Sequence, residues 1–136
     1  MRKAAALTVL LTLLLSPPAA ARDHIIFTAN QEFLSRIYVL TMDGSVERYF
    51  EYEFYRWCDM EVVDGELYVA EAFAPRVYRV DVETGGLEVV VDDWSLYYFY
   101  GLAFDGQYFY VDEWDLNRYT IDGVKDGTAS FDGDVF

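Results

Sequence analysis

Two similar stretches of sequence decide the fold: CDMEVVDGELYVAE (residues 58–71) and YGLAFDGQYFYVDE (residues 100–113). Each stretch places an Asp-Gly pair between two short apolar runs, which is typical of a β-hairpin. At an offset of 42 residues, Leu67 aligns with Phe109, Tyr68 with Tyr110, Val69 with Val111, and Glu71 with Glu113. Further on, RVYRVD (76–81) matches NRYTID (117–122) at an offset of 41, and RIYVLTMDG (36–44) matches RVYRVDVETG (76–85) at an offset of 40. A unit of about 41 residues therefore repeats along the chain.

The rest of the chain follows the same pattern of short strands and tight turns. Asp-Gly pairs begin at residues 43, 64, 105, 122, 126 and 132, and the runs between them are rich in Val, Ile, Tyr and Phe. Residues 67–70 and 89–91 are apolar at successive positions, so we expect both of these strands to be covered on two faces. Repeats of about 40 to 50 residues with four short strands each are typical of β-propeller blades. A β-sandwich is the alternative, but it requires a cleaner alternation of apolar and polar residues and does not explain the repeat.

The segments GLAFDGQYFYVDEWDLNRYTID (101–122) and DMEVVDGELYVAEAFAPRVYRVD (59–81) resemble the blades of NHL-type and YVTN-type propellers. The resemblance covers most of residues 24–134. It implies an all-β, propeller-like array of four-stranded antiparallel blades, with approximate blades at 24–57, 58–99 and 100–136 after a signal peptide at 1–21. Propellers of these types include lactonases, lyases and binding proteins, so the resemblance predicts a fold and leaves the function open.

Three blades do not complete a ring, because closed propellers typically have four to eight. The first blade has strands IIFTA, RIYVL and VERYF and lacks an innermost strand, and the third is complete only if GTASF (127–131) forms a strand. The chain could be a piece of a longer propeller, a decayed remnant with an open arc, or one half of a homodimer that completes a ring. Because no capping element precedes residue 136, we expect a piece or a remnant rather than the dimer.

The N-terminal sequence predicts export from the cytoplasm. A basic start at Arg2 and Lys3 precedes the apolar residues 4–15, and small residues then lead to a cleavage site near Ala21–Arg22. We therefore expect a secreted or periplasmic protein. The processed chain has eight basic and 24 acidic residues, a formal charge of −16, which disfavours nucleic acid and membrane insertion as modes of binding.

Residues typical of catalysis are scarce. The chain has one histidine, His24, near the processed N-terminus, and one cysteine, Cys58, which we expect to be buried. Patterns such as GxSxG, CxxC, HExxH and a phosphate-binding loop do not occur in the sequence. The sequence thus favours a non-enzymatic binding or scaffold module without a cofactor.

Acidic and aromatic residues follow the second strand of each predicted blade and fill the connections between blades. In the propellers that the chain resembles, both kinds of segment lie on one face. A face of this composition suits a carbohydrate or a cationic protein ligand. The candidate ligand-binding residues are Glu71, Asp112, Glu113, Trp94, Tyr98, Tyr100 and Trp114.

A metal-dependent enzyme is the alternative hypothesis. In this hypothesis Glu71, Asp112 and Glu113 bind Ca²⁺ in a lactonase-like or hydrolase-like site, since this ion prefers several carboxylate ligands. The C-terminal acids Asp122, Asp126, Asp132 and Asp134 are a second set of calcium candidates. They do not follow the spacing of an EF-hand, and solvated turns explain them better.

The aromatic run WSLYYFYG (94–101) can be divided by the repeat. At an offset of 42, Tyr55 aligns with Tyr97 and Trp57 with Phe99, so we expect these rings to pack between blades. Tyr98 and Tyr100 have no aromatic counterpart and are free to bind a ligand. Packing of the whole run between the blades is the other interpretation of this segment.

Overall fold

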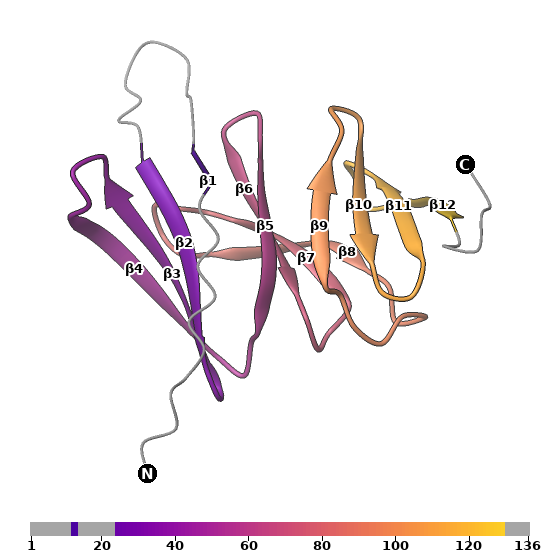
Figure 1. The fold of residues 1–136 in the computed structure, drawn as a ribbon, viewed down its shortest axis with the longest axis horizontal. Helices are drawn as coiled ribbons and strands as arrows, with labels where there is room; N and C mark the ends of the chain where they lie inside the picture. The colour runs from indigo at the N-terminus through magenta and orange to yellow at the C-terminus, as the bar shows by residue number, and fades with distance from the viewer. Residues whose placement is uncertain (1–11, 14–23, 130–136) are drawn as a thin grey trace. The chain divides into compact units, whose positions relative to one another are not determined.

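The computed structural model describes residues 12–13 and 24–129, which form β-strands and turns without a helix (Figure 1). The described strands make three antiparallel sheets, each with four strands in sequential order. The chain divides into two compact units, Met1–Trp57 (unit 1) and Cys58–Phe136 (unit 2). The predicted all-β class, with propeller-like four-stranded antiparallel sheets, is therefore confirmed.

Unit 1 holds one sheet, in the order β1 (Thr12–Leu13), β2 (His24–Gln31), β3 (Leu34–Thr41) and β4 (Val46–Glu53). A row of rings crosses it: the centroids of Phe27 and Tyr38 are 4.6 Å apart, and those of Tyr38 and Tyr49 are 5.7 Å apart. Such cross-strand aromatic pairs stabilise a sheet and set its register. The three strands predicted for the blade at 24–57 are β2, β3 and β4. A two-residue fourth strand, β1, comes from residues 12–13 of the predicted signal peptide and pairs with β2.

The segment after β4 is fixed by two polar side chains. The Asn30 amide donates to the carbonyl of Trp57 at 2.7 Å and accepts from its N–H at 3.2 Å, and the Ser35 hydroxyl donates to the carbonyl of Tyr55. Trp57 is only 2% exposed, and its ring lies 5.2 Å from that of Tyr52. The predicted burial of Trp57 is confirmed.

Unit 2 holds two sheets. The first has the order β5 (Trp57–Val63), β6 (Glu66–Glu71), β7 (Arg76–Val80) and β8 (Leu87–Asp92). The second has the order β9 (Gly101–Phe104), β10 (Tyr108–Asp112), β11 (Leu116–Thr120) and β12 (Lys125–Ala129). The strand predicted at 127–131 thus begins two residues earlier, and its last two residues lie outside the described part of the chain.

The two sheets of unit 2 repeat each other in detail. β7 and β11 each carry an irregularity against the next strand, between Val77 and Tyr78 and between Arg118 and Tyr119, which is 41 residues further on. Between β5 and β6, Asp64 and Gly65 form a two-residue turn, and both have positive φ, 51° and 84°. Between β9 and β10 the turn has three residues, 105–107, so its Asp-Gly pair lies 41 residues after Asp64-Gly65, although the positions before and after the turn align at 42.

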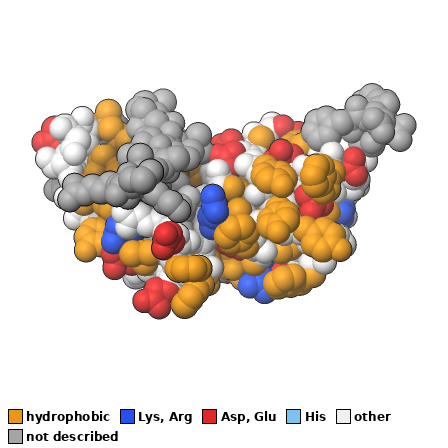
Figure 2. Space-filling view, turned by 60° about the horizontal axis from the view of Figure 1, so that its bottom comes forward, with side chains coloured by type: hydrophobic (Ala, Val, Ile, Leu, Met, Phe, Trp, Pro, Cys, Tyr) orange, Lys and Arg blue, Asp and Glu red, His pale blue; other side chains and the backbone are white. Residues whose placement is uncertain are grey.

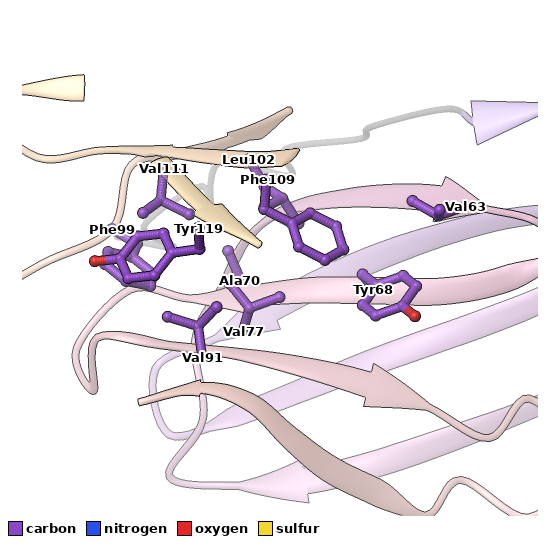
Figure 3. Close-up of a cluster of buried hydrophobic side chains, with 10 residues drawn as sticks. All are labelled: Val63, Tyr68, Ala70, Val77, Val91, Phe99, Leu102, Phe109, Val111 and Tyr119. Carbon is purple, nitrogen blue, oxygen red and sulfur yellow. The ribbon is translucent and has the colours of Figure 1, made fainter. Parts of the chain in front are cut away.

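The core of unit 2 lies between its two sheets (Figure 3). Strand β6 is buried from Leu67 to Glu71, which confirms that it is covered on both faces. The prediction is wrong for β8, where Val89 is 47% exposed, because β8 is the outermost strand of its sheet. The buried side chains in the core are those of Val63, Tyr68, Ala70, Val77, Val91, Phe99, Leu102, Phe109, Val111 and Tyr119.

Gly123, in the turn between β11 and β12, lies against the backbone of β8. Its φ is +79°, and a Cβ atom added there would lie 2.7 Å from the carbonyl carbon of Val90 and closer still to the carbonyl oxygen. Gly106 has a similar φ of +102°, but a Cβ atom there would meet nothing within 4 Å. Gly106 requires glycine for its φ alone, whereas Gly123 requires glycine both for its φ and for the short distance to β8. Comparing alanine variants at the two positions thus measures the two effects apart.

We expect Gly106→Ala to lower the free energy of unfolding by about 1 kcal/mol, through φ strain alone. Gly123→Ala should cost more, about 3 kcal/mol, because the turn must also move away from β8. Urea unfolding monitored by tryptophan fluorescence measures both. Equal losses for the two variants would contradict the close packing of this turn on β8.

Candidate functional site

Three loops meet at one end of unit 2: residues 72–75 after β6, 93–100 between the sheets, and 113–115 after β10. Backbone hydrogen bonds join the first two, from the N–H of Phe99 to the carbonyl of Ala72 at 3.3 Å and from the N–H of Asp93 to the carbonyl of Pro75 at 3.1 Å. These loops expose six large rings, which we call the aromatic loop surface: Phe73, Trp94, Tyr97, Tyr98, Tyr100 and Trp114, each between 42% and 75% exposed. Figure 2 turns the lower edge of Figure 1 toward the viewer and shows hydrophobic side chains gathered over this part of unit 2.

Glu71, a predicted ligand-binding residue, lies beneath this surface. It is 2% exposed, and its carboxylate accepts hydrogen bonds from the N–H groups of Phe73, at 3.1 Å, and Ala74. A buried carboxylate that satisfies backbone donors in this way stabilises the loop. The role that the structure gives to Glu71 is therefore to order the loop that carries Phe73.

Glu113 orders the aromatic run in the same way. Its Oε1 accepts from the N–H of Tyr97 at 2.6 Å and from the N–H of Tyr98 at 3.2 Å. The carboxylate thus crosses from the loop after β10 to the loop between the sheets. Because it accepts from two successive N–H groups, it orders the backbone that carries both tyrosine rings.

Asp112 is half-buried at the end of β10, opposite Gly101 in β9. Its Oδ1 would lie 2.8 Å from a Cβ atom at Gly101, so a side chain at that position would push the carboxylate away. Asp59 reaches the same place from β5, where its Oδ2 accepts from the N–H of Leu102 at 2.9 Å. Sequence analysis missed Asp59, although the 42-residue repeat aligns it with Gly101, the residue that it approaches.

Asp93 is a second organising residue that sequence analysis missed. Its carboxylate accepts from the Tyr119 hydroxyl at 2.6 Å, from the Ser95 N–H at 3.0 Å and from the Lys125 ammonium at 3.2 Å. Burial acts to raise its pKa, but the hydrogen bonds from Ser95, Tyr119 and Lys125 outweigh it and lower the pKa to about 2. The signal in the sequence is an Asp two residues before a Ser after a strand, which favours a turn closed by the Asp side chain.

The rings of the surface contact one another. Tyr98 lies edge-on to Phe73, with centroids 6.0 Å apart, and 6.3 Å from Tyr100. The structure therefore brings the predicted Tyr98 and Tyr100 together and adds Phe73, which was not among the predicted binding residues. Trp94 lies under the guanidinium of Arg76, 5.0 Å from the ring centroid.

The division of the aromatic run by the repeat is partly right. Phe99 is fully buried in the core, as predicted, and Tyr98 and Tyr100 are exposed. Tyr97 was expected to pack between blades, and this is wrong, since 75% of it is exposed. The alignment identifies equivalent backbone positions, but it does not determine which side chain enters the core: the Tyr97 N–H is bound by Glu113, and its ring lies outside.

Metal binding and thiol chemistry find little support in the described residues. Within residues 12–13 and 24–129, no group of three or more His, Cys, Asp or Glu side chains could hold a metal ion. Of the proposed C-terminal calcium ligands, Asp132 and Asp134 lie outside these ranges.

Cys58 is half-buried, and its thiol contacts the carbonyl of Ala70 at 3.4 Å. Burial and the nearby Asp59 carboxylate raise the pKa of Cys58 to about 12, so it is not a nucleophilic thiolate at neutral pH.

A hollow of about 490 Å³ lies at the opposite end of unit 2, beside the turns that follow β5 and β7. Its central charged side chain, Arg79, pairs with Glu66 at 3.0 Å and with Glu88. Because these exposed charges are paired with one another, they give the hollow little means of selecting a charged ligand. The aromatic loop surface is the stronger candidate.

Comparison with known proteins does not identify a function for this surface. No protein-family model matches the chain, and no curated protein matches it. In the described part of the chain, no helix has the length and apolar character needed to cross a bilayer. The residues and contacts above are thus the basis for any functional conclusion.

The low pKa of Asp93 predicts how stability depends on pH. Because the carboxyl titrates near 2 when folded and near 3.9 when unfolded, its stabilisation of about 2 kcal/mol is present above pH 4 and is lost as the pH falls toward 2. Asp93→Asn should therefore lower the free energy of unfolding at pH 7 by about that amount, and the deficit should shrink below pH 4. Urea unfolding across this pH range measures the effect.

Asp122→Asn is the matched control, since it removes the same charge from an exposed turn. It should change stability by less than about 0.5 kcal/mol. A deficit for Asp93→Asn that stays constant down to pH 2 would show that its carboxylate is not the stabilising group.

Proposed function

We propose that this protein is a non-enzymatic binding module that acts outside the cytoplasm and binds a cationic protein segment on the aromatic loop surface. The observation that carries the proposal is the exposure of six large rings on three loops that buried or bridging carboxylates hold in place. An exposed apolar cluster on ordered loops is typical of an interaction site. The signal peptide predicted at residues 1–21 supports the location.

The charge of the loops supports a cationic partner. Arg76 is the one basic residue in the segments 71–76, 92–101 and 112–117, and it is already paired with Asp92 at 2.8 Å. The same segments contain six acidic residues: Glu71, Asp92, Asp93, Asp112, Glu113 and Asp115. A lysine or arginine of a partner would gain from this field, whereas an anionic segment would be repelled.

The rings also suit such a partner. Within the protein itself, the Arg76 guanidinium lies 5.0 Å from the centroid of Trp94, which is a cation–π contact. Exposed tyrosine and tryptophan rings with acidic neighbours can bind the cations of another chain in the same manner. Carbohydrate binding would also use the rings, by stacking, and the carboxylates, as acceptors for hydroxyl groups, but a neutral sugar would gain nothing from the net negative charge.

The calcium-dependent hydrolase alternative receives less support. It needs Glu71 and Glu113 as metal ligands, but both carboxylates accept hydrogen bonds from backbone N–H groups of the loops. Withdrawing either carboxylate from these donors would disorder the loop that it holds. We therefore propose binding rather than metal-assisted catalysis.

The processed chain, beginning at Arg22, can be tested with a synthetic arginine-rich peptide and with its sequence-matched glutamate-rich counterpart. Calorimetry should detect the first and not the second, and added salt should weaken binding. Replacing Tyr98 and Trp114 together by Ala should raise the dissociation constant about tenfold, since each lost cation–π contact is worth about 0.5–1 kcal/mol.

Tyr49→Ala is the matched control, because Tyr49 is a tyrosine of unit 1 that is 54% exposed. Neither variant changes the net charge, so a loss confined to the first separates the surface from the general acidity of the protein. Equal affinity of both variants would contradict the proposed site. Binding of a neutral oligosaccharide such as cellohexaose, insensitive to salt, in place of the peptide would contradict the cationic partner.

A further inference from the structure

The strand β2 of unit 1 has an edge whose occupant belongs to the predicted signal peptide. On one side β2 pairs with β3 along its whole length, from His24 opposite Thr41 to Gln31 opposite Leu34. On the other side it pairs with residues 12–13, at Ile26 and Ile25. Cleavage near Ala21–Arg22 would remove those residues. Among the strands that the structure describes, none would then lie beside that side of β2, and its N–H and C=O groups there would be open.

In a chain with 24 acids, β2 is a long strand, of eight residues (HIIFTANQ), without a carboxylate, lysine or arginine. Its single titratable side chain, His24, turns across the sheet to Glu47 of β4, at 2.7 Å. Natural sheets protect an open edge with charges, proline or an irregularity. The edge strands β4, β5, β8 and β12 all carry charged residues. The edge strand β9, GLAF, carries none, but it has only four residues, and a very short edge offers little to pair with. Among the described edges, β2 is therefore the long strand without charge.

The strand is also held rigidly before any partner arrives. Ile26 and Thr28, on one face, are 1% and 6% exposed, and Phe27, on the other, stacks on Tyr38 at 4.6 Å. An ordered strand with an open edge loses little conformational entropy when another strand pairs with it. After processing, the side chains of β2 would still be packed, but its backbone would have no hydrogen-bonding partner among the described strands on that edge.

We propose that β2 is a strand-acceptor edge, and that in the processed protein its occupant is β2 of a second copy, paired antiparallel across a two-fold axis. Antiparallel self-pairing suits an isologous dimer, because each copy supplies the same strand. Because β2 has no acidic residue, pairing two copies of it places no like charges opposite each other. This is important in a chain whose net charge after processing is −16, since most of its other strands would repel their own copies. Residues 12–13 hold the same edge in the intact chain, so they block the dimer until they are removed.

The processed chain, beginning at Arg22, should be a dimer by light scattering coupled to size-exclusion chromatography, and dilution should dissociate it. Ile25→Lys places a charge on the half-buried edge residue and should raise the dimer dissociation constant at least about tenfold. Val46→Lys is the matched control on β4, the opposite edge of the same sheet, where Val46 is 55% exposed. It should leave the dimer intact.

Hydrogen exchange gives a measurement that needs no variant. The amides of β2 should lose protection on dilution of the processed chain, whereas those of β3, enclosed between two strands, should not. A processed chain that stays monomeric at high concentration would overturn the proposal. So would a dimer that Val46→Lys dissociates and Ile25→Lys does not. These outcomes concern unit 1 and are independent of peptide binding on unit 2.

Discussion

The burial of Phe99 between the two sheets of unit 2 is the constraint on which the candidate site depends. Its ring is fully enclosed in the core, and its N–H donates to the carbonyl of Ala72 in the facing loop. A buried phenylalanine contributes about 2 kcal/mol or more from transfer out of water. With Phe99 held inward, the rings of the flanking residues, Tyr98 and Tyr100, lie at the surface. The same packing that stabilises unit 2 thus creates its exposed aromatic surface.

Carboxylates complete this arrangement by giving the loops a fixed form. Glu71, Asp93 and Glu113 accept backbone N–H groups of two of the loops, residues 72–75 and 93–100. Loop backbone has few partners within a sheet, so an acceptor that reaches it from elsewhere removes much of its freedom. An acidic sequence therefore serves two purposes in unit 2. Some of its carboxylates build the surface from beneath, while others, such as Asp115, leave it negatively charged.

Unit 1 uses different means. A row of stacked rings crosses its three long strands, and Asn30 and Ser35 fasten the segment that follows them. Its charges lie mainly on β4, while β2 presents a neutral edge. The distribution of charge among edge strands is visible in the sequence once the strands are known. Which strand forms an edge is a property of the sheet order alone.

The sequence by itself determined the all-β class, the repeat and the strand pairs, because Asp-Gly turns and apolar runs are local signals that need no distant partner. It also predicted the burial of Phe99 and the exposure of Tyr98 and Tyr100, since a recurring aromatic position reflects a recurring core. It could not place Tyr97, Val89 or Glu71, whose environments depend on Glu113, on the sheet order and on the N–H groups of a folded loop. Only the tertiary structure decided these, because a side chain's exposure depends on residues brought to it by folding rather than on its neighbours in sequence.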